Sequence, residues 1–137
     1  MPTELEDRCN AIEECYEFML AYAAQGLPSD AGTATGGQLR EFLQRASAAV
    51  SGLAGSYRSA IEEGGLQPAA SYQAFLKVLD RDATDALAAM ELVLAQAAIS
   101  SQLIDNLNAS MHLRALLTDL FLIDEVLKLH HVSAATS

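Results

Sequence analysis

The stretch MHLRALLTDLFLIDEVLKL, residues 111–129, decides the fold of this chain. An ordinary surface helix carries one apolar stripe, and this stretch has more apolar side chains than one stripe can hold. It is also too short and too charged for a segment that crosses a membrane. We therefore predict a helix that buries one face in a core and carries a second apolar face elsewhere.

A helical wheel at about 100° per residue resolves these side chains into two stripes on nearly opposite sides. The first stripe is typical of a core face and consists of Leu113, Leu116, Leu117, Leu120, Ile123 and Leu127. The second stripe consists of Met111, Ala115, Leu122, Val126 and Leu129. Polar residues, among them His112 and Asp119, separate the two stripes.

The segment before residue 107 repeats this pattern, with a second stripe of Ala88, Leu92, Ala95, Ile99 and Leu103. If the chain turns near residue 107 into an antiparallel hairpin, the two second stripes lie side by side. In that register Leu103 falls near Met111, Ile99 near Ala115, Leu92 near Leu122 and Ala88 near Val126. A continuous exposed apolar patch marks an association site, so we predict a homodimer in which both stripes pack across a two-fold axis. The alternative is a five-helix fold that buries both stripes internally.

The composition indicates an all-α protein with a single helical domain over residues 1–137. One domain is expected for 137 residues, and a hydrophobic content of 51% excludes disorder for most of the chain. Ala, Leu, Glu and Gln dominate the long segments between the prolines, and these residues are strong helix formers. We expect the C-terminus to fray from about residue 132.

The periodicity predicts an antiparallel four-helix bundle with helices over residues 3–25, 38–63, 70–106 and 110–130. A break near Asp82 in the third helix would give five helices. Thr3 with Glu6 forms a capping-box pattern at the first helix start. Gly52 and Gly55 weaken the middle of the second helix, which indicates either close approach by another backbone or an exposed, weak helix centre.

The formal net charge of -10 repels nucleic acid and anionic lipid and favours a basic protein partner. Acidic residues in the first 17 positions take the place of a basic end and an apolar run, so we expect no signal peptide and a cytoplasmic location. Cys9 and Cys15 are interpreted as small buried apolar residues, because no metal or redox spacing accompanies them.

Few residues have the arrangement that catalysis or metal binding needs. His112 on a helix flank resembles the phosphorylated histidine of histidine phosphotransfer domains, but the Lys and Gly that follow it in those domains are absent here. No Glu is followed by His three positions later, so a di-metal bundle is not indicated. The acid–amide pairs Asp105 with Asn108 and Glu41 with Gln44 have the spacing of some response-regulator phosphatases, a spacing that chance often produces.

We therefore predict a non-enzymatic, dimeric interaction protein, such as an adaptor, regulator or assembly chaperone, without cofactor or metal. It would use its acidic surface and the apolar hairpin. The alternative is a small-ligand-binding or sensor protein, and phosphotransfer through His112 ranks third. The candidate ligand pocket of that alternative is lined by Tyr16, Phe18, Met19, Tyr22, Tyr57, Tyr72, Phe75 and Met90.

Overall fold

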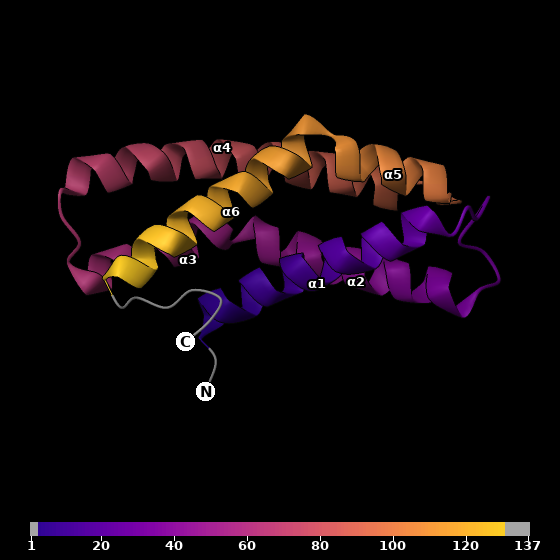
Figure 1. Ribbon diagram of the computed structural model, residues 1–137, viewed down its shortest axis with the longest axis horizontal. Helices are drawn as coiled ribbons and strands as arrows, with labels where there is room; N and C mark the ends of the chain where they lie inside the picture. Colours follow the sequence, from indigo (N-terminus) through magenta and orange to yellow (C-terminus); the bar gives the residue numbers. More distant parts are fainter. Residues whose placement is uncertain (1–2, 131–137) are drawn as a thin grey trace.

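The computed structural model describes residues 3–130, and this part of the chain folds into six helices without a strand (Figure 1). The helices are α1 Glu4–Ala24, α2 Ala34–Ser51, α3 Leu53–Gly64, α4 Ala69–Leu94, α5 Ser101–Ala109 and α6 Met111–Leu129. The prediction of an all-α protein is therefore confirmed, and the predicted number of four or five helices is wrong. The fraying expected from about residue 132 lies outside the described residues.

The helices follow one another back and forth along the long axis of the molecule (Figure 1). In this view α1 runs from left to right, α2 and α3 return to the left, and α4 runs to the right again. The last two helices return to the left, and α6 crosses α4 diagonally while it contacts that helix. Among the described residues, no helix combines the length and the apolar character required to span a bilayer.

Three local expectations from the sequence are confirmed, two at helix ends and one inside α4. The Thr3 side chain accepts a hydrogen bond from the Glu6 amide at 3.1 Å, and α1 begins at Glu4, directly after Thr3. Ser110 ends α5 and also caps α6, because its side chain accepts from the Leu113 amide at 3.3 Å. The third predicted helix continues through Asp82, since α4 is unbroken from Ala69 to Leu94.

The helix predicted over residues 38–63 is wrong at its start and in its middle. It begins at Ala34, because the Thr33 side chain caps it and the glycine pair at 36 and 37 lies inside its first turn. It ends at Ser51, and α3 starts after Gly52. At this break the Arg8 guanidinium donates to the carbonyls of Ala48 and Ala49 at 3.1 and 3.0 Å. A side chain of α1, rather than a neighbouring backbone, therefore fills the space beside Gly52.

The helix predicted over residues 70–106 is also wrong, because α4 stops at Leu94 and α5 begins only at Ser101. Arg40 of α2 stabilises this end by donating to the carbonyl of Leu94 at 3.3 Å and to that of Gln96 at 2.9 Å. The Asp30 carboxylate accepts from the Arg40 guanidinium and, at 2.7 Å, from the Ile99 amide. These contacts join the α1–α2 loop to the α4–α5 loop, and we call them the loop junction.

Further hydrogen bonds extend the loop junction into the core. The Tyr22 hydroxyl donates to the Ile99 carbonyl at 2.6 Å, and the Ser101 hydroxyl donates to the Tyr22 carbonyl at 2.6 Å. Ser101 and Leu27 exchange two more hydrogen bonds, each of 2.8 Å. Since buried polar groups are stable only when paired, this network fixes where the chain leaves α4 and enters α5.

Candidate interaction surface

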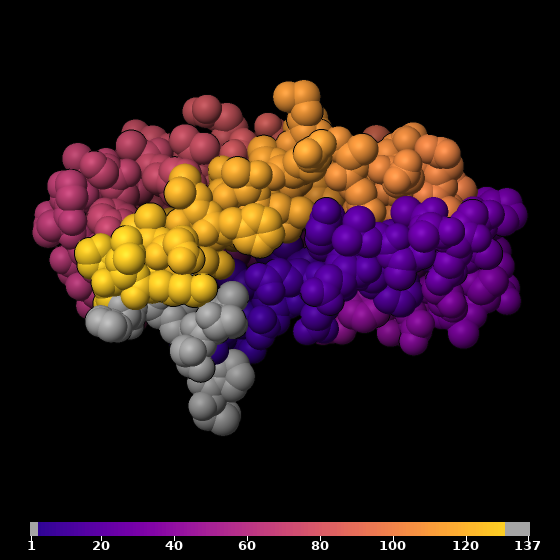
Figure 2. All heavy atoms as spheres, viewed as in Figure 1, coloured from indigo at the N-terminus to yellow at the C-terminus, as the bar shows by residue number. Residues whose placement is uncertain are grey.

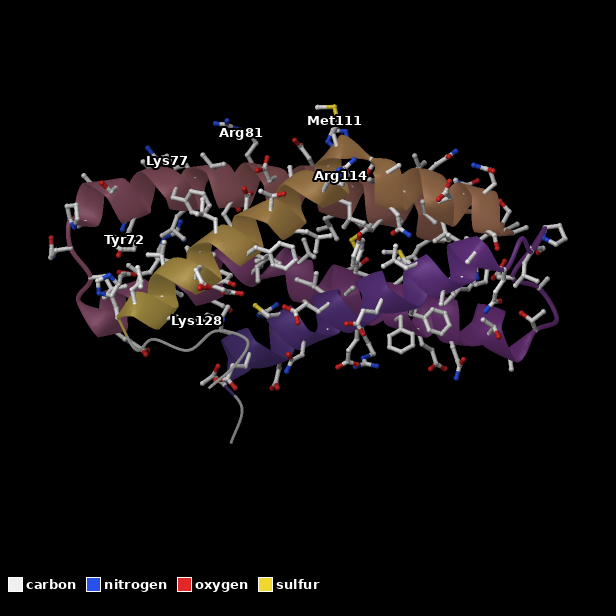
Figure 3. The ribbon with its side chains drawn as sticks, viewed as in Figure 1. Tyr72, Lys77, Arg81, Met111, Arg114 and Lys128 are labelled. Carbon is white, nitrogen blue, oxygen red and sulfur yellow. The ribbon has the colours of Figure 1, made fainter. Side chains whose placement is uncertain are left out.

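An apolar groove lies between the first half of α4 and the second half of α6. It has a volume of about 310 Å³ and is lined by Pro68, Ser71, Tyr72, Phe75, Leu122, Ile123 and Val126. Its walls are almost entirely hydrocarbon and aromatic, as expected of a surface that takes up an apolar group. Figure 3 shows Tyr72 at this end of the molecule, between α4 and the C-terminal part of α6.

Several large apolar side chains of α6 point outward beside or beyond this groove. The outer side chains of α6 are Met111, Phe121, Leu122 and Leu129. Their exposed fractions range from 55% for Leu122 to 82% for Met111. In the space-filling view of Figure 2, α6 crosses the visible face of the molecule, and the side chain of Met111 is labelled at the upper edge in Figure 3. Exposed apolar side chains beside an apolar groove are typical of an association surface.

The core stripe and the second stripe of α6 lie as the helical wheel places them. The core stripe is buried throughout, from Leu113 to Leu127. In the second stripe Met111, Leu122 and Leu129 are exposed, whereas Ala115 and Val126 are half-buried. Whether this stripe forms a dimer interface stays a prediction.

The predicted register between the two second stripes is wrong. Groove residues Tyr72 and Phe75 of α4 lie opposite Leu122 and Val126 of α6, so Leu92 does not face Leu122. The reason is that α4 ends early, at Leu94. The chain then turns, and α5 forms the first part of the segment that runs back alongside α4. The turn therefore precedes α5 instead of falling near residue 107, and α6 meets α4 close to where α4 begins.

The other half of the predicted interface is divided between surface and core. Ala88, Leu92 and Ala95 are exposed, and Leu103 is half-buried. Ile99 is fully buried, with its amide bonded to Asp30 and its carbonyl bonded to Tyr22. Ile99 therefore belongs to the core and cannot contribute its side chain to an outer surface.

A pair of carboxyl groups lies one helical turn from the groove, where α6 crosses α4. Asp119 of α6 is buried, and its carboxyl lies near that of Asp82 of α4, which is half-buried. One carboxyl oxygen of Asp119, Oδ2, is buried without a hydrogen-bond partner among the described residues. Burial of Asp119 and the neighbouring negative charge of Asp82 together raise the pKa of Asp119 to about 7. We call Asp82 and Asp119 the carboxyl pair.

A second buried polar cluster joins α1, α3 and α6. The Tyr57 hydroxyl donates to Asp124 at 2.6 Å and lies 3.2 Å from the Cys9 sulfur. Burial raises the pKa of the Tyr57 hydroxyl, the Asp124 carboxyl and the Cys9 thiol, the last to about 12. A thiol with such a pKa stays protonated at neutral pH and is a poor nucleophile, so the cluster positions helices and does not supply a reactive cysteine.

The aromatic and methionine residues of the alternative ligand pocket do not meet in one place. Met19, Tyr22, Tyr57 and Met90 are buried in the core. Phe18 stacks against Phe42, with ring centroids 4.7 Å apart. The remaining members lie in separate hollows, with Tyr72 and Phe75 in the apolar groove and Tyr16 in another depression.

That other depression lies between the C-terminal half of α1 and the α5–α6 junction. It measures about 420 Å³, and its lining includes Tyr16, Leu20, Asp105, Asn108 and Arg114. The Asn108 side chain is buried, and neither its amide nitrogen nor its oxygen has a hydrogen-bond partner among the described residues. Because Asn108 is buried while Asp105 is exposed, the two do not present the paired, accessible groups of a phosphatase motif.

His112 is exposed in the first turn of α6. Within residues 3–130, no three His, Cys, Asp or Glu side chains are placed to hold a metal ion. Burial raises the pKa of Cys15, like that of Cys9, to about 12. These residues offer no geometry from which a catalytic step can be derived.

The sequence reasoning missed the groove and the carboxyl pair for the same reason. Both depend on the register of α6 against α4, which the break after Leu94 determines. Ser100 is the signal that was available, because its side chain accepts from the Leu103 amide at 3.0 Å and caps α5. Serine is a favoured N-cap residue, and a helix start at residue 101 would have moved the turn to its observed place.

These features define the class of protein: a chain that is helical throughout its described residues, with an exposed apolar surface on α6. No protein-family model matches the chain, and neither a curated protein nor a solved structure matches it. The interpretation of its function therefore depends on the chemistry of this surface.

Proposed function

We propose that this protein is a non-enzymatic interaction protein that forms a homodimer through the apolar groove and the outer side chains of α6. The observation that carries the proposal is the exposure of Leu122 directly beside the groove. Burial of one leucine side chain contributes about 1.5–3 kcal/mol to association. The outer side chains of α6 are therefore a substantial apolar surface when they are left in water.

A second copy of the chain fits this surface because protrusion and groove lie next to each other. Under a two-fold axis each protomer presents the same patch to its partner. Leu122 or Leu129 of one protomer can then enter the groove of the other while its own groove receives the equivalent side chain. Side chains that fill pockets near the centre of an interface usually dominate its binding energy.

The charge distribution also favours contact on this side of the molecule. Six acidic residues and a single basic residue, Arg8, lie on α1. On α6, Arg114 and Lys128 accompany the three acidic residues, and Lys128 lies 3.8 Å from Glu125. The excess of negative charge on α6 is therefore smaller than that on α1, which reduces the repulsion between two copies that meet through α6.

Substitution of Leu122 by Asp tests the proposal. We expect Leu122→Asp to raise the dimer dissociation constant about a hundredfold, which corresponds to about 2.7 kcal/mol. The matched control is Leu20→Asp, because Leu20 is a similarly exposed leucine on α1, outside the groove. Sedimentation equilibrium measures both. A wild-type protein that is monomeric at micromolar concentration, or an equal loss in the two variants, would exclude this dimer.

The acidic α1 surface and a basic partner protein remain part of the broader proposal of an adaptor, regulator or assembly chaperone. Native mass spectrometry of the protein from its source distinguishes the occupants of the surface. A mass of twice the chain supports the homodimer, whereas a co-purifying basic protein in a one-to-one complex indicates that the groove serves a different partner. The cytoplasmic location expected from the sequence stays a prediction.

The depression around Asn108 supports a second candidate function, the binding of a small polar ligand. A buried amide without partners is costly, by about 1–3 kcal/mol, and a ligand with both a donor and an acceptor would satisfy it. Arg114 at the rim favours an anionic group on that ligand. A small molecule retained in the native mass spectrum and lost from Asn108→Ala supports this function, and its presence in both proteins would contradict it.

The arrangement of the helices is itself part of the proposal. We infer that α2 with α3, and α5 with α6, each act as one kinked rod. The six helices would then form the antiparallel four-helix bundle that the periodicity predicts. The alternating chain directions in Figure 1 support this reading.

A further inference from the structure

The depression that contains Asn108 combines two opposite charges with an apolar wall, in a volume of about 420 Å³. Asp105 of α5 supplies the carboxylate, and Arg114 in the first turn of α6 supplies the guanidinium. Figure 3 labels Arg114 near the start of α6, next to α5. Leu20 and Ala23 of α1 belong to the apolar wall. Three helices therefore place an anion, a cation and hydrocarbon around one hollow.

The two charged side chains of the depression do not neutralise each other. Both Asp105 and Arg114 are exposed, and among residues 3–130 neither of them takes part in an ion pair. Each charge is therefore available to a group of the opposite sign on a ligand. A ligand that carries charge of one sign only would meet one attractive and one repulsive side chain, whereas a zwitterion would meet two attractive ones.

The Asn108 side chain supplies the observation that points to a ligand. Asn108 lines the depression and is only 9% exposed, yet neither its amide nitrogen nor its amide oxygen has a hydrogen-bond partner among the described residues. The nitrogen donates and the oxygen accepts, so a ligand with an acceptor beside a donor would satisfy both atoms. Asp105 and Asn108 are three positions apart on α5, which places their Cβ atoms about 5–6 Å apart. A donor that reaches the amide oxygen therefore also lies close to the Asp105 carboxylate.

We propose that the depression binds a free α-amino acid with an apolar side chain. The ammonium group of the ligand donates to the Asn108 amide oxygen and to the Asp105 carboxylate. Its carboxylate accepts from the Asn108 amide nitrogen and from the Arg114 guanidinium, while its side chain packs against Leu20 and Ala23. The inference rests on the second candidate function, the binding of a small polar ligand, and names the chemical class of that ligand.

The charge of the whole chain also favours a zwitterion over a simple anion. The formal net charge of -10 repels an anion that approaches from solution, whereas an α-amino acid has no net charge at neutral pH. Hydrogen bonds between charged groups are among the strong ones in proteins, and each methylene group that the ligand buries against the apolar wall adds about fourfold in affinity. Charge therefore selects the backbone of the ligand, and the wall selects its side chain.

The depression and the apolar groove lie at opposite ends of α6. Arg114 of the depression is in the first turn of that helix, and Leu122 and Val126 of the groove are in its second half. Leu122→Asp, which is designed to disrupt the dimer, should therefore leave amino-acid binding unchanged. The two proposed surfaces can fail separately.

The first experiment titrates the full chain with L-leucine in a calorimeter and compares three related compounds. N-acetyl-leucine lacks the ammonium group, leucine methyl ester lacks the carboxylate, and glycine lacks the side chain. We expect each of the three to bind about tenfold more weakly than leucine or worse, because each loses one set of the proposed contacts.

The second experiment repeats the titrations with variants that remove one charge each. Asp105→Asn should bind leucine about tenfold more weakly and should not lose affinity for N-acetyl-leucine, which has no ammonium group to pair. Arg114→Gln should likewise bind leucine about tenfold more weakly and should not lose affinity for the methyl ester. The matched controls are Asp85→Asn and Arg81→Gln, at exposed positions of α4 outside the depression, and both should bind like the wild type.

Asn108→Leu distinguishes a binding asparagine from a structural one. Leucine has nearly the same size as asparagine but no polar atoms, so the variant should bind leucine about a hundredfold more weakly while the unliganded protein is no less stable to urea. A structural asparagine would have the opposite effect, a loss of stability with unchanged binding. If Asn108→Leu does not fold, the exposed variants at Asp105 and Arg114 carry the test.

The outcomes separate this inference from the function on which it rests. If N-acetyl-leucine binds as tightly as leucine, the zwitterion is overturned and a small anionic ligand remains. If none of the four compounds binds, but the native mass spectrum shows another small molecule that Asn108→Ala loses, the amino acid is overturned and the second candidate function stands. If neither is found, both fail. Leucine binding that is unchanged in Asp105→Asn and Arg114→Gln overturns this depression as the site.

Discussion

Two aspartates are buried at different places in the molecule: Asp30 in the loop between α1 and α2, and Asp119 on α6 where that helix crosses α4. Their exposed fractions are nearly equal, at 7% and 9%. Asp30 meets the Arg40 guanidinium and the Ile99 amide, and these donors, Arg40 above all, lower the pKa of its carboxyl. Asp119 meets another carboxyl, and burial together with that neighbour raises its pKa to about 7.

The comparison shows that burial alone does not decide the charge of a side chain. An opposite charge and hydrogen-bond donors favour the ionised form, whereas a like charge favours the neutral form. The loop junction is therefore a fixed structural feature at neutral pH. The carboxyl pair, in contrast, changes its charge within the range of pH that proteins ordinarily experience.

The largest effect is expected at Arg40. Arg40→Met leaves Asp30 buried without its partner and removes the donors to the carbonyls at the end of α4. Removal of one member of a buried ion pair usually costs about 3–5 kcal/mol, and we expect this loss in the free energy of unfolding by urea. Arg45→Met is the control, because Arg45 lies on the same helix and forms only an exposed pair with Glu14 at 3.6 Å. Arg45→Met should lower the free energy of unfolding by less than about 1 kcal/mol. Equal losses in the two variants would show that the contact with Arg40 does not stabilise Asp30.

The next largest effect is expected at Gly36, where α2 touches the loop junction. A Cβ atom at this position would lie 2.0 Å from the backbone oxygen of Asp30, a contact that a backbone atom cannot easily avoid. Overpacking of this kind costs about 1–3 kcal/mol, and we expect Gly36→Ala to lie at the upper end of this range in thermal or chemical unfolding. A Cβ atom at Gly37 would meet no atom within 4 Å, so Gly37→Ala should raise the free energy of unfolding by up to about 1 kcal/mol. A similar change of stability in both variants would contradict the close packing.

The third prediction is that the two aspartates have opposite pH profiles. Asp30 has a lowered pKa, so the advantage of the wild type over Asp30→Asn should be present above the unfolded pKa and shrink as the pH falls below it. Asp119 has a raised pKa, so Asp119→Asn should gain stability over the wild type as the pH rises, by about 1–3 kcal/mol at pH 8. Urea unfolding at several pH values measures the difference in free energy of unfolding between the wild type and each variant. If both differences changed with pH in the same direction, the contrast between the two sites would be refuted.

The parts of the fold that could be predicted from the sequence depend on neighbouring residues. The cap at Thr3, the continuity of α4 through Asp82 and the break at Ser110 are all determined within about one helical turn. The core stripe of α6 follows in the same way from the helical period. Local periodicity therefore identified which face of α6 is buried.

The parts that could not be predicted depend on residues distant in the chain. The break at Gly52 involves Arg8 of α1, and the end of α4 involves Asp30 and Arg40. Each break changes which residues of the later helices lie opposite which residues of the earlier ones. The groove and the carboxyl pair are products of that register, so a pattern read along one helix could not place Asp119 opposite Asp82.

The smallest effect is expected at Gly52, between α2 and α3, where a second arginine, Arg8, contacts the end of a helix. Arg8, like Arg40, donates to carbonyls at the end of a helix, but its carboxylate partner Glu4 is exposed. A Cβ atom at Gly52 would lie 2.5 Å from the Arg8 guanidinium, whose flexible side chain can move away. Gly52→Ala should therefore change the free energy of unfolding by less than about 1 kcal/mol.

Gly55→Ala provides the reference for that measurement. A Cβ atom there meets nothing within 4 Å, so the substitution should stabilise the protein by about 0.5–1 kcal/mol through the lower backbone entropy of the unfolded chain. If Gly52→Ala gains as much as Gly55→Ala, the contacts of Arg8 contribute nothing. If it instead loses several kcal/mol, Arg8 is as firmly held as Arg40, and pairing with an exposed carboxylate is sufficient to fix a helix end.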